Sequence, residues 1–154
     1  MKRERNAWLI VASVILMFLT ACQTYSEEDK KGFDAKISHY LSKKGITNYT
    51  QTESGLYYVI KDTGAGEWLR YTDSVSFTYK AWLLNGKMVD NQKDTLTFPM
   101  RKLIGAWKEV MLELKPGAHV FFVAPPQLCY GEHKLTDIPQ HSVLVFDMHI
   151  HGVK

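Results

Sequence analysis

The histidines are the side chains best suited to metal chemistry in this chain. His149 and His151 alternate along the last expected strand and therefore project to the same side of it. A metal ion needs three or more ligands held close together, whereas His119, His133 and His141 belong to other segments of the chain. Paired histidines on the wet face of a strand are ordinary, so we expect neither a metal site nor a cofactor.

The thiol of Cys129 is the second candidate for chemistry. A nucleophilic cysteine needs a nearby base or positive charge to form the thiolate, and no base lies beside Cys129 in the sequence. We therefore interpret Cys129 as a small buried thiol next to Tyr130.

Cys22 has a different context, which indicates covalent modification. It follows Leu19-Thr20-Ala21, one apolar and two small residues, and this order matches the lipobox of bacterial lipoproteins. The basic start of the chain and the apolar run 7–19 are typical of a secretory signal and short for a membrane span. We expect cleavage after residue 21 and lipid on Cys22 that holds the protein on a membrane. The alternative is an uncleaved anchor helix, and with Cys22 modified no disulfide is expected.

Length and charge limit the remaining possibilities. A chain of 154 residues, 45% of them hydrophobic, can bury one ordinary core. The 19 basic and 16 acidic residues nearly balance once the basic start is removed, which argues against a nucleic-acid partner. We divide the chain into a signal peptide at 1–21, a tether with an amphipathic helix at 22–52, and one folded domain at 53–154.

A short amphipathic helix is expected before the domain. Its apolar stripe recurs at helical spacing, with Asp34 in the first turn and Gly45 as the stop, and consists of Phe33, Ile37, Tyr40 and Leu41. The charged segment 23–31 before it is interpreted as a solvated spacer.

The rest of the chain alternates with the period of strands, interrupted by one helix. The strands are expected at 56–61, 73–84, 87–90, 95–98, 118–124 and 142–153. Asn85-Gly86 predicts a tight hairpin, and a long loop covers 125–141. The helix has an apolar face of Leu103, Trp107, Val110, Met111 and Leu114. This order predicts an α+β fold in which an antiparallel sheet wraps around one α-helix.

The outer face of this sheet carries apolar side chains where polar ones are usual. They are Trp82, Phe121, Val123 and Val145. We expect the N-terminal amphipathic helix to pack across them, because so short a helix needs tertiary support.

The segment from Ser54 to Val153 resembles the FKBP-type peptidyl-prolyl isomerases in motif order and spacing. The matching motifs are Ser54-Gly55-Leu56-Tyr57-Tyr58, Gly64-Ala65-Gly66-Glu67, Asn85-Gly86-Lys87-Met88-Val89-Asp90, Leu103-Ile104-Gly105-Ala106-Trp107, Pro125-Pro126-Gln127-Leu128-Cys129-Tyr130-Gly131, Ile138-Pro139 and Leu144-Val145-Phe146-Asp147. The resemblance implies an FKBP-like fold with a shallow apolar pocket. It also implies catalysis of X-Pro isomerisation without nucleophile, metal or cofactor.

The resemblance further implies which residues form the pocket. Catalytic roles fall on Tyr79, Asp90, Trp107, Tyr130 and Phe146. Substrate-binding walls fall on Val89, Leu96, Leu103, Ile104 and Ile138. Trp107 is expected as the floor, and the Tyr130 hydroxyl as a donor to a substrate carbonyl.

Departures from the family pattern leave two functions open. Val89 and Leu96 stand where large aromatic residues are usual, and Ala106 replaces a glycine, so a wide pocket with low catalytic efficiency and poor macrolide binding is expected. The first function is an isomerase, with chaperone action, on proline-containing polypeptides of the bacterial cell envelope. The alternative is a catalytically weak or inactive FKBP-like binding module in an envelope complex. In either case we expect a monomer on a lipid anchor.

Overall fold

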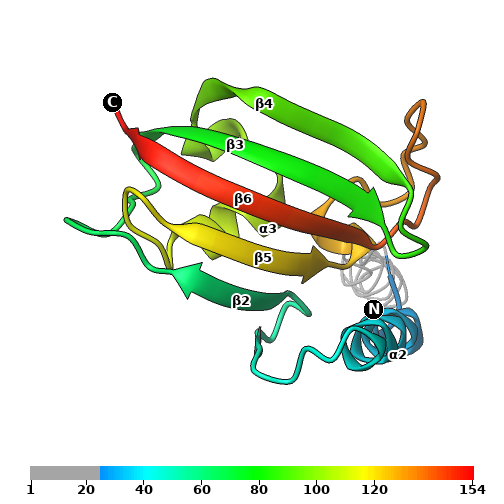
Figure 1. Cartoon of the computed structure of the whole chain (residues 1–154). Coiled ribbons are helices and arrows are strands. Elements are labelled where there is room, and N and C mark those ends of the chain that lie inside the picture. Colours follow the sequence, from blue (N-terminus) through cyan, green and yellow to red (C-terminus); the bar gives the residue numbers. More distant parts are fainter. Residues whose placement is uncertain (1–24) are drawn as a thin grey trace, which may run out of the picture.

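One twisted antiparallel sheet dominates the computed structural model, which describes residues 25–154 (Figure 1). The strands are β1 (Thr50–Gln51), β2 (Tyr57–Asp62), β3 (Ser74–Leu83), β4 (Met88–Pro99), β5 (His119–Ala124) and β6 (Leu144–Val153). Their order across the sheet is β1-β2-β5-β6-β3-β4. The expected signal peptide and Cys22 lie outside the described residues.

A single short helix, α3 (Gly105–Met111), packs behind the sheet in the view of Figure 1. The side chains between helix and sheet form the main core, which includes Leu56, Val75, Phe77, Trp107, Val110, Met111, Leu114, Val120, Phe122, Leu144, Met148 and Ile150. Strand residues contribute to this core at every second position, as a sheet with one face on a helix requires. The expected α+β fold is confirmed.

Two element boundaries differ from the expected ones. The separate strands expected at 87–90 and 95–98 are parts of the single strand β4, and shifts of register opposite Phe77/Tyr79 and Ala81/Trp82 absorb the irregular pairing. The main helix is shorter than its apolar pattern suggests. A 3₁₀ turn, η1 (Met100–Lys102), precedes it, and Leu103 and Ile104 are in extended conformation.

The N-terminal helix α2 (Glu27–Lys43) is longer than expected. Ser26 and Asp29 form a reciprocal capping box, in which each side chain accepts a hydrogen bond from the other residue's backbone N–H. The acidic residues interpreted as part of a solvated spacer are therefore the first turn of the helix. Their negative charge there interacts favourably with the positive end of the helix dipole. Asp34 lies near the middle of α2, and its carboxylate accepts hydrogen bonds from Tyr57 and Gln51.

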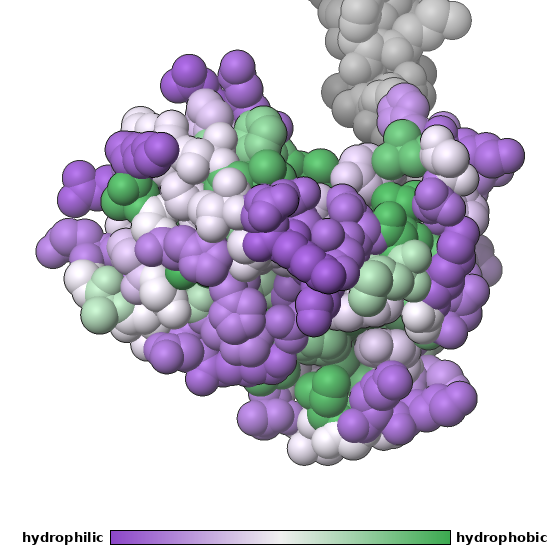
Figure 2. All heavy atoms as spheres, turned by 45° about the horizontal axis from the view of Figure 1, so that its top comes forward, coloured by the Kyte–Doolittle hydropathy of each residue, from purple (hydrophilic) through white to green (hydrophobic). Residues whose placement is uncertain are grey.

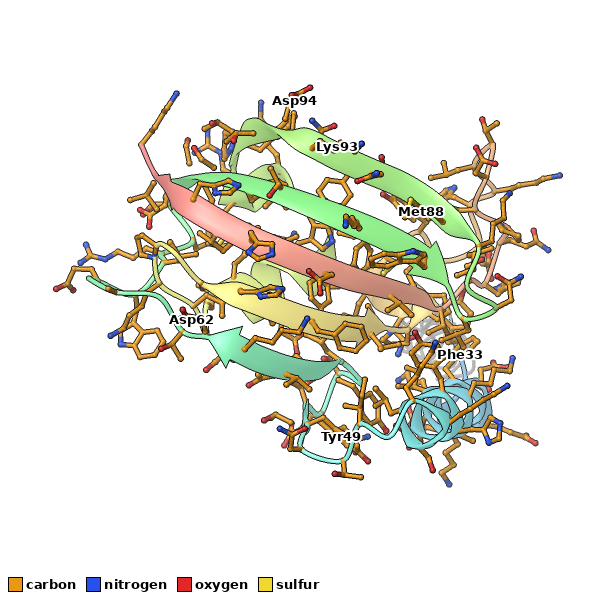
Figure 3. All side chains as sticks on the ribbon, in the orientation of Figure 1. Phe33, Tyr49, Asp62, Met88, Lys93 and Asp94 are labelled. Atoms are coloured by element: carbon orange, nitrogen blue, oxygen red, sulfur yellow. The ribbon has the colours of Figure 1, made fainter. Side chains whose placement is uncertain are left out.

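Helix α2 covers one end of the outer face of the sheet, as expected (Figure 1). A second core forms there from Tyr25, Phe33, Ile37, Leu41, Tyr57, Val123, Val143 and Val145, with Tyr40, Trp82 and Phe121 at its border. Figure 3 shows Phe33 on the side of α2 that meets the sheet. Between residues 25 and 154, no helix has the length and apolar character needed to cross a membrane.

Candidate active site

An apolar hollow of about 250 Å³ opens between the edge of the sheet and the start of α3. Strand β3, strand β4, the segment before α3, the helix itself and the loop after β5 all contribute to it. The lining residues are Phe77, Tyr79, Leu96, Phe98, Lys102, Leu103, Ile104, Trp107 and Tyr130. A pocket of this composition binds an apolar group mainly by shape and desolvation.

Trp107 forms the floor of the hollow and is fixed by aromatic packing. It is 8% exposed. The edges of Phe77, Tyr79 and Phe146 meet its ring at centroid distances of 5.3, 4.6 and 5.6 Å, which are favourable T-shaped contacts. The buried indole N–H has no acceptor among the residues described. Packing therefore holds the indole in place, without a hydrogen bond.

Tyr79 and Asp90 form a hydrogen-bonded pair beside the floor. The Tyr79 hydroxyl donates to the Asp90 carboxylate at 2.5 Å, and the backbone N–H of Asn91 donates to the other carboxylate oxygen at 2.8 Å. Burial, followed by the nearby Asp90 carboxylate, raises the pKa of Tyr79. The phenol is therefore protonated at neutral pH and orients the exposed Asp90.

Tyr130 lies on the opposite wall, in the loop between β5 and β6. Burial is the main cause that raises its pKa, so its hydroxyl also remains a donor at neutral pH. The loop is braced on both sides. The N–H of Gly131 donates to the Pro126 carbonyl, the N–H of His141 donates to the Gly131 carbonyl, and the Tyr25 hydroxyl is hydrogen-bonded to the His141 ring at 2.8 Å. The segment that leads into α2 thus helps to hold the Tyr130 loop.

Cys129 is a free thiol next to Tyr130. Burial raises the pKa of this thiol to about 12, so it carries almost no thiolate at neutral pH. This agrees with its interpretation as an inert small side chain.

The hollow brings together most of the residues expected at the site. Tyr79, Leu96, Leu103, Ile104, Trp107 and Tyr130 line it directly. Phe146 is 2% exposed and supports Trp107 from below, outside the lining. Asp90 reaches the site through Tyr79. Val89 and Ile138 pack against the main core and are not among the lining residues.

The sequence interpretation missed Phe98, which is 43% exposed at the rim of the hollow. The alternation of strand β4 could have revealed it, because Phe98 follows Leu96 by two residues on the same face. An aromatic side chain therefore borders the hollow beside Leu96, where the sequence analysis expected none. Figure 2 shows only small apolar areas among polar ones on the face that it draws, so the exposed apolar surface there is limited.

The expectation that His119 lies apart from His149 is wrong. His119 lies directly opposite His149 in the pairing of β5 and β6, and Asp147 lies on the same face, so these three side chains form one cluster. The cluster is on the outer face of the sheet, away from the hollow.

An antiparallel sheet half-wrapped around one helix, with an aromatic-floored hollow beside the start of that helix, defines the class of fold and the site. The profile of the FKBP-type peptidyl-prolyl cis-trans isomerase family matches residues 67–151. The chain belongs to this family.

Several relatives share much of its sequence. FkpA from Escherichia coli (strain K12), an FKBP-type peptidyl-prolyl cis-trans isomerase, is 33% identical over 139 residues, which are 88% of this chain and 52% of the relative. A probable FKBP-type peptidyl-prolyl cis-trans isomerase from Haemophilus influenzae is 35% identical over 153 residues, 97% of this chain and 62% of the relative. The chain thus spans about half to three fifths of the length of these curated relatives.

Solved structures agree with the fold. The crystal structure of FkpA from Escherichia coli has a TM-score of 0.72 at 28% identity and covers 100% of this chain and 73% of that one. A peptidyl-prolyl cis-trans isomerase from Pseudomonas syringae has a TM-score of 0.69 at 21% identity, covering 87% of this chain and 99% of that one. The second likeness supports the fold alone.

Proposed function

We propose that this chain catalyses cis-trans isomerisation of X-Pro bonds in exported polypeptides. The observation that carries the proposal is the hollow itself, with a rigid indole as its floor and the phenol of Tyr130 on one wall. Family membership supplies the reaction class, and the hollow supplies a site that suits it.

The chemistry needs no bond-making group. The X-Pro amide is partly double-bonded, and uncatalysed rotation crosses a barrier of about 18–20 kcal/mol. Twisting the bond breaks the resonance and reduces the negative charge on the carbonyl oxygen. An apolar, water-excluding site therefore disfavours the planar amide relative to the twisted transition state.

Each part of the hollow has a role in this proposal. The prolyl ring lies on the Trp107 indole, between the walls formed by Leu103 and Ile104. The Tyr130 hydroxyl donates a hydrogen bond to a substrate carbonyl and fixes the peptide while the amide turns. Tyr79 is hydrogen-bonded to Asp90, and its ring centroid is 4.6 Å from that of Trp107. Tyr79 therefore keeps the floor in position.

Replacing Tyr130 with phenylalanine tests this assignment. The change removes one hydroxyl and keeps the ring, so we expect kcat/KM toward a prolyl tetrapeptide to fall by about two- to tenfold, the range of one neutral hydrogen bond. A protease-coupled isomerisation assay measures it. Tyr58→Phe, which removes the hydroxyl of a half-buried tyrosine on the main-core side of β2, is the matched control and should keep full activity. A wild-type chain that shows no turnover above the uncatalysed rate contradicts the proposal.

A second candidate function is a binding module of the cell envelope with weak or lost turnover. Two departures favour it: Val89 adds no aromatic wall to the hollow, and Ala106 is packed in the core before the tryptophan. In this case the hollow binds proline-containing segments without turning them, and the same surface serves chaperone action. Measuring peptide binding and isomerisation on the same samples distinguishes the two, because only the module retains binding without turnover.

We propose that the mature protein is held on a membrane of the bacterial cell envelope by lipid on Cys22. The lipobox before Cys22 and the basic, apolar start of the chain support this. Replacing Cys22 with serine is expected to move the protein from the membrane fraction to the soluble fraction after export. Mass spectrometry of the wild-type N-terminus should find acyl chains on residue 22. If mass spectrometry finds that the wild-type protein still begins at Met1, the proposal is contradicted.

A further inference from the structure

The outer face of the sheet is divided into two parts. Helix α2 covers the apolar part around Val123 and Val145 (Figure 1), whereas the part around Asp147 and His149 carries polar side chains that are half-buried or exposed. Three side chains with metal-ligand chemistry meet in the polar part: His119 from β5, and Asp147 and His149 from β6.

The pairing of the strands makes this cluster a fixed feature. His119 and His149 are direct partners across β5 and β6, and Asp147 is two residues before His149 on the same strand and face. Each ligand is therefore attached to the backbone of a central strand. Sites built on such elements are positioned more accurately than sites on loops.

The ligand atoms already lie near the spacing of a coordination shell. The Nε2 atom of His119 is 2.9 Å from Oδ1 of Asp147, and Nε2 of His149 is 3.8 Å from the same oxygen. All three atoms lie within 4.8 Å of one another. Bonds of about 2.0–2.2 Å in a tetrahedral shell put neighbouring ligand atoms about 3.3–3.6 Å apart. Rotation of the exposed His149 ring about its side-chain bonds is the movement that would bring all three ligand atoms to one ion.

The two imidazole rings are stacked, so the lone pairs in their ring planes are nearly parallel and one ring must turn before both can reach one ion. The ring centroids are 3.7 Å apart with an interplanar angle of 20°. The carboxylate uses Oδ1 toward the histidines and Oδ2 toward the ammonium of Lys61, at 2.7 Å. The ammonium holds the carboxylate by its outer oxygen and also places a positive charge beside the cluster.

We propose that His119, Asp147 and His149 form a binding site for a divalent first-row transition metal ion, with Zn²⁺ as the reference ion. Two imidazoles and one carboxylate are ligands that suit Zn²⁺, Cu²⁺ or Ni²⁺ better than Mg²⁺ or Ca²⁺. Water fills the remaining position of the shell. The ion links β5 to β6 on the face opposite the isomerase hollow.

Lys61 makes the proposal sharply testable. Its ammonium lies 2.7 Å from Asp147 Oδ2 and 3.5 Å from His119 Nε2, so its charge opposes that of an incoming cation. If the cluster is a metal site, replacing Lys61 with methionine strengthens binding. If the cluster is only a structural network of charges, the same change breaks the network and creates no affinity.

The experiment is a calorimetric titration of the full chain with Zn²⁺ alone. We expect saturable binding of one ion per chain, together with a rise in Tm, because the folded state binds the ion better than the unfolded state. His149→Ala should abolish saturable binding at the Zn²⁺ concentrations that saturate the wild type, since it removes one of the three direct ligands. Lys61→Met should tighten binding.

The matched control is His151→Ala. His151 is on the same strand and face, two residues further on, and is hydrogen-bonded to Thr78 instead of Asp147. Its removal should leave Zn²⁺ binding unchanged. No saturable binding in the wild type, equal binding in His149→Ala, or unchanged or weaker binding in Lys61→Met overturns the proposal. Circular dichroism of each metal-free variant verifies folding, and isomerase activity should be the same in all of them.

Discussion

Replacing Trp107 with leucine is expected to lower kcat/KM for prolyl peptides by roughly ten- to a hundredfold, or about 1.4–2.7 kcal/mol of transition-state stabilisation. In the proposed mechanism the prolyl ring lies on Trp107, and the rings of Phe77, Tyr79 and Phe146 pack against the indole in T-shaped arrangements. Leucine keeps an apolar floor but removes the flat surface and most of these contacts. The protease-coupled assay, with peptide binding measured separately, reports the loss.

Trp68→Leu is the matched control for this change. Trp68 is 52% exposed and lies over the Lys115 ammonium, outside the hollow. The same exchange of residue types there should leave kcat/KM unchanged. Because Trp107 is part of the main core, the thermal unfolding of both variants must be measured, and activity compared well below each Tm. Equal activity of Trp107→Leu and wild type at full folding would remove Trp107 from the site.

Replacing Ile37 with alanine is expected to lower the free energy of unfolding by about 2–5 kcal/mol, the range for a large-to-small change in a core. Ile37 is 0% exposed and belongs to the second core between α2 and the sheet. The loss measures how firmly α2 is bound to the domain. Urea unfolding followed by circular dichroism gives the value.

His39→Ala, on the exposed side of the same helix, is the control and should change the free energy of unfolding by less than about 0.5 kcal/mol. If Ile37→Ala unfolds at the same urea concentration as this control, α2 does not pack on the sheet in solution. A firmly packed α2 also has a consequence for the site, because Tyr25 at its start is hydrogen-bonded to His141 in the Tyr130 loop.

Much of the hollow could be predicted from local motifs because its residues follow turns and element ends that short stretches of sequence specify. Trp107 comes two residues after the helix start at Gly105, and Tyr79 lies on the inward face of a strand that alternates regularly. Val89 and Ile138 were expected in the walls, but they are not among the residues that line the hollow. Their positions depend on a strand with shifted register and on an irregular loop, where periodicity gives no guidance.

The N-terminal helix also combines features that the sequence predicts with features that only the folded chain shows. Its apolar stripe and the uncovered apolar positions on the sheet, both visible in the sequence, were enough to predict that one covers the other. The start of the helix at Glu27 was missed because acidic residues suit a solvated spacer as well as a capped first turn. The Ser26–Asp29 capping box favours the helix. The rings of Tyr25 and Phe33, whose centroids are 5.2 Å apart, add support that only the folded chain provides.

The sequence by itself determined the family, the class of fold and the faces of the elements, because alternation and turn chemistry act over a few neighbouring residues. Only the tertiary structure decided which distant residues meet. His119 and His149 are thirty positions apart in numbering, and they become neighbours through the register of β5 and β6. That register follows from packing of the whole core, since a slip by one residue would turn every buried side chain outward.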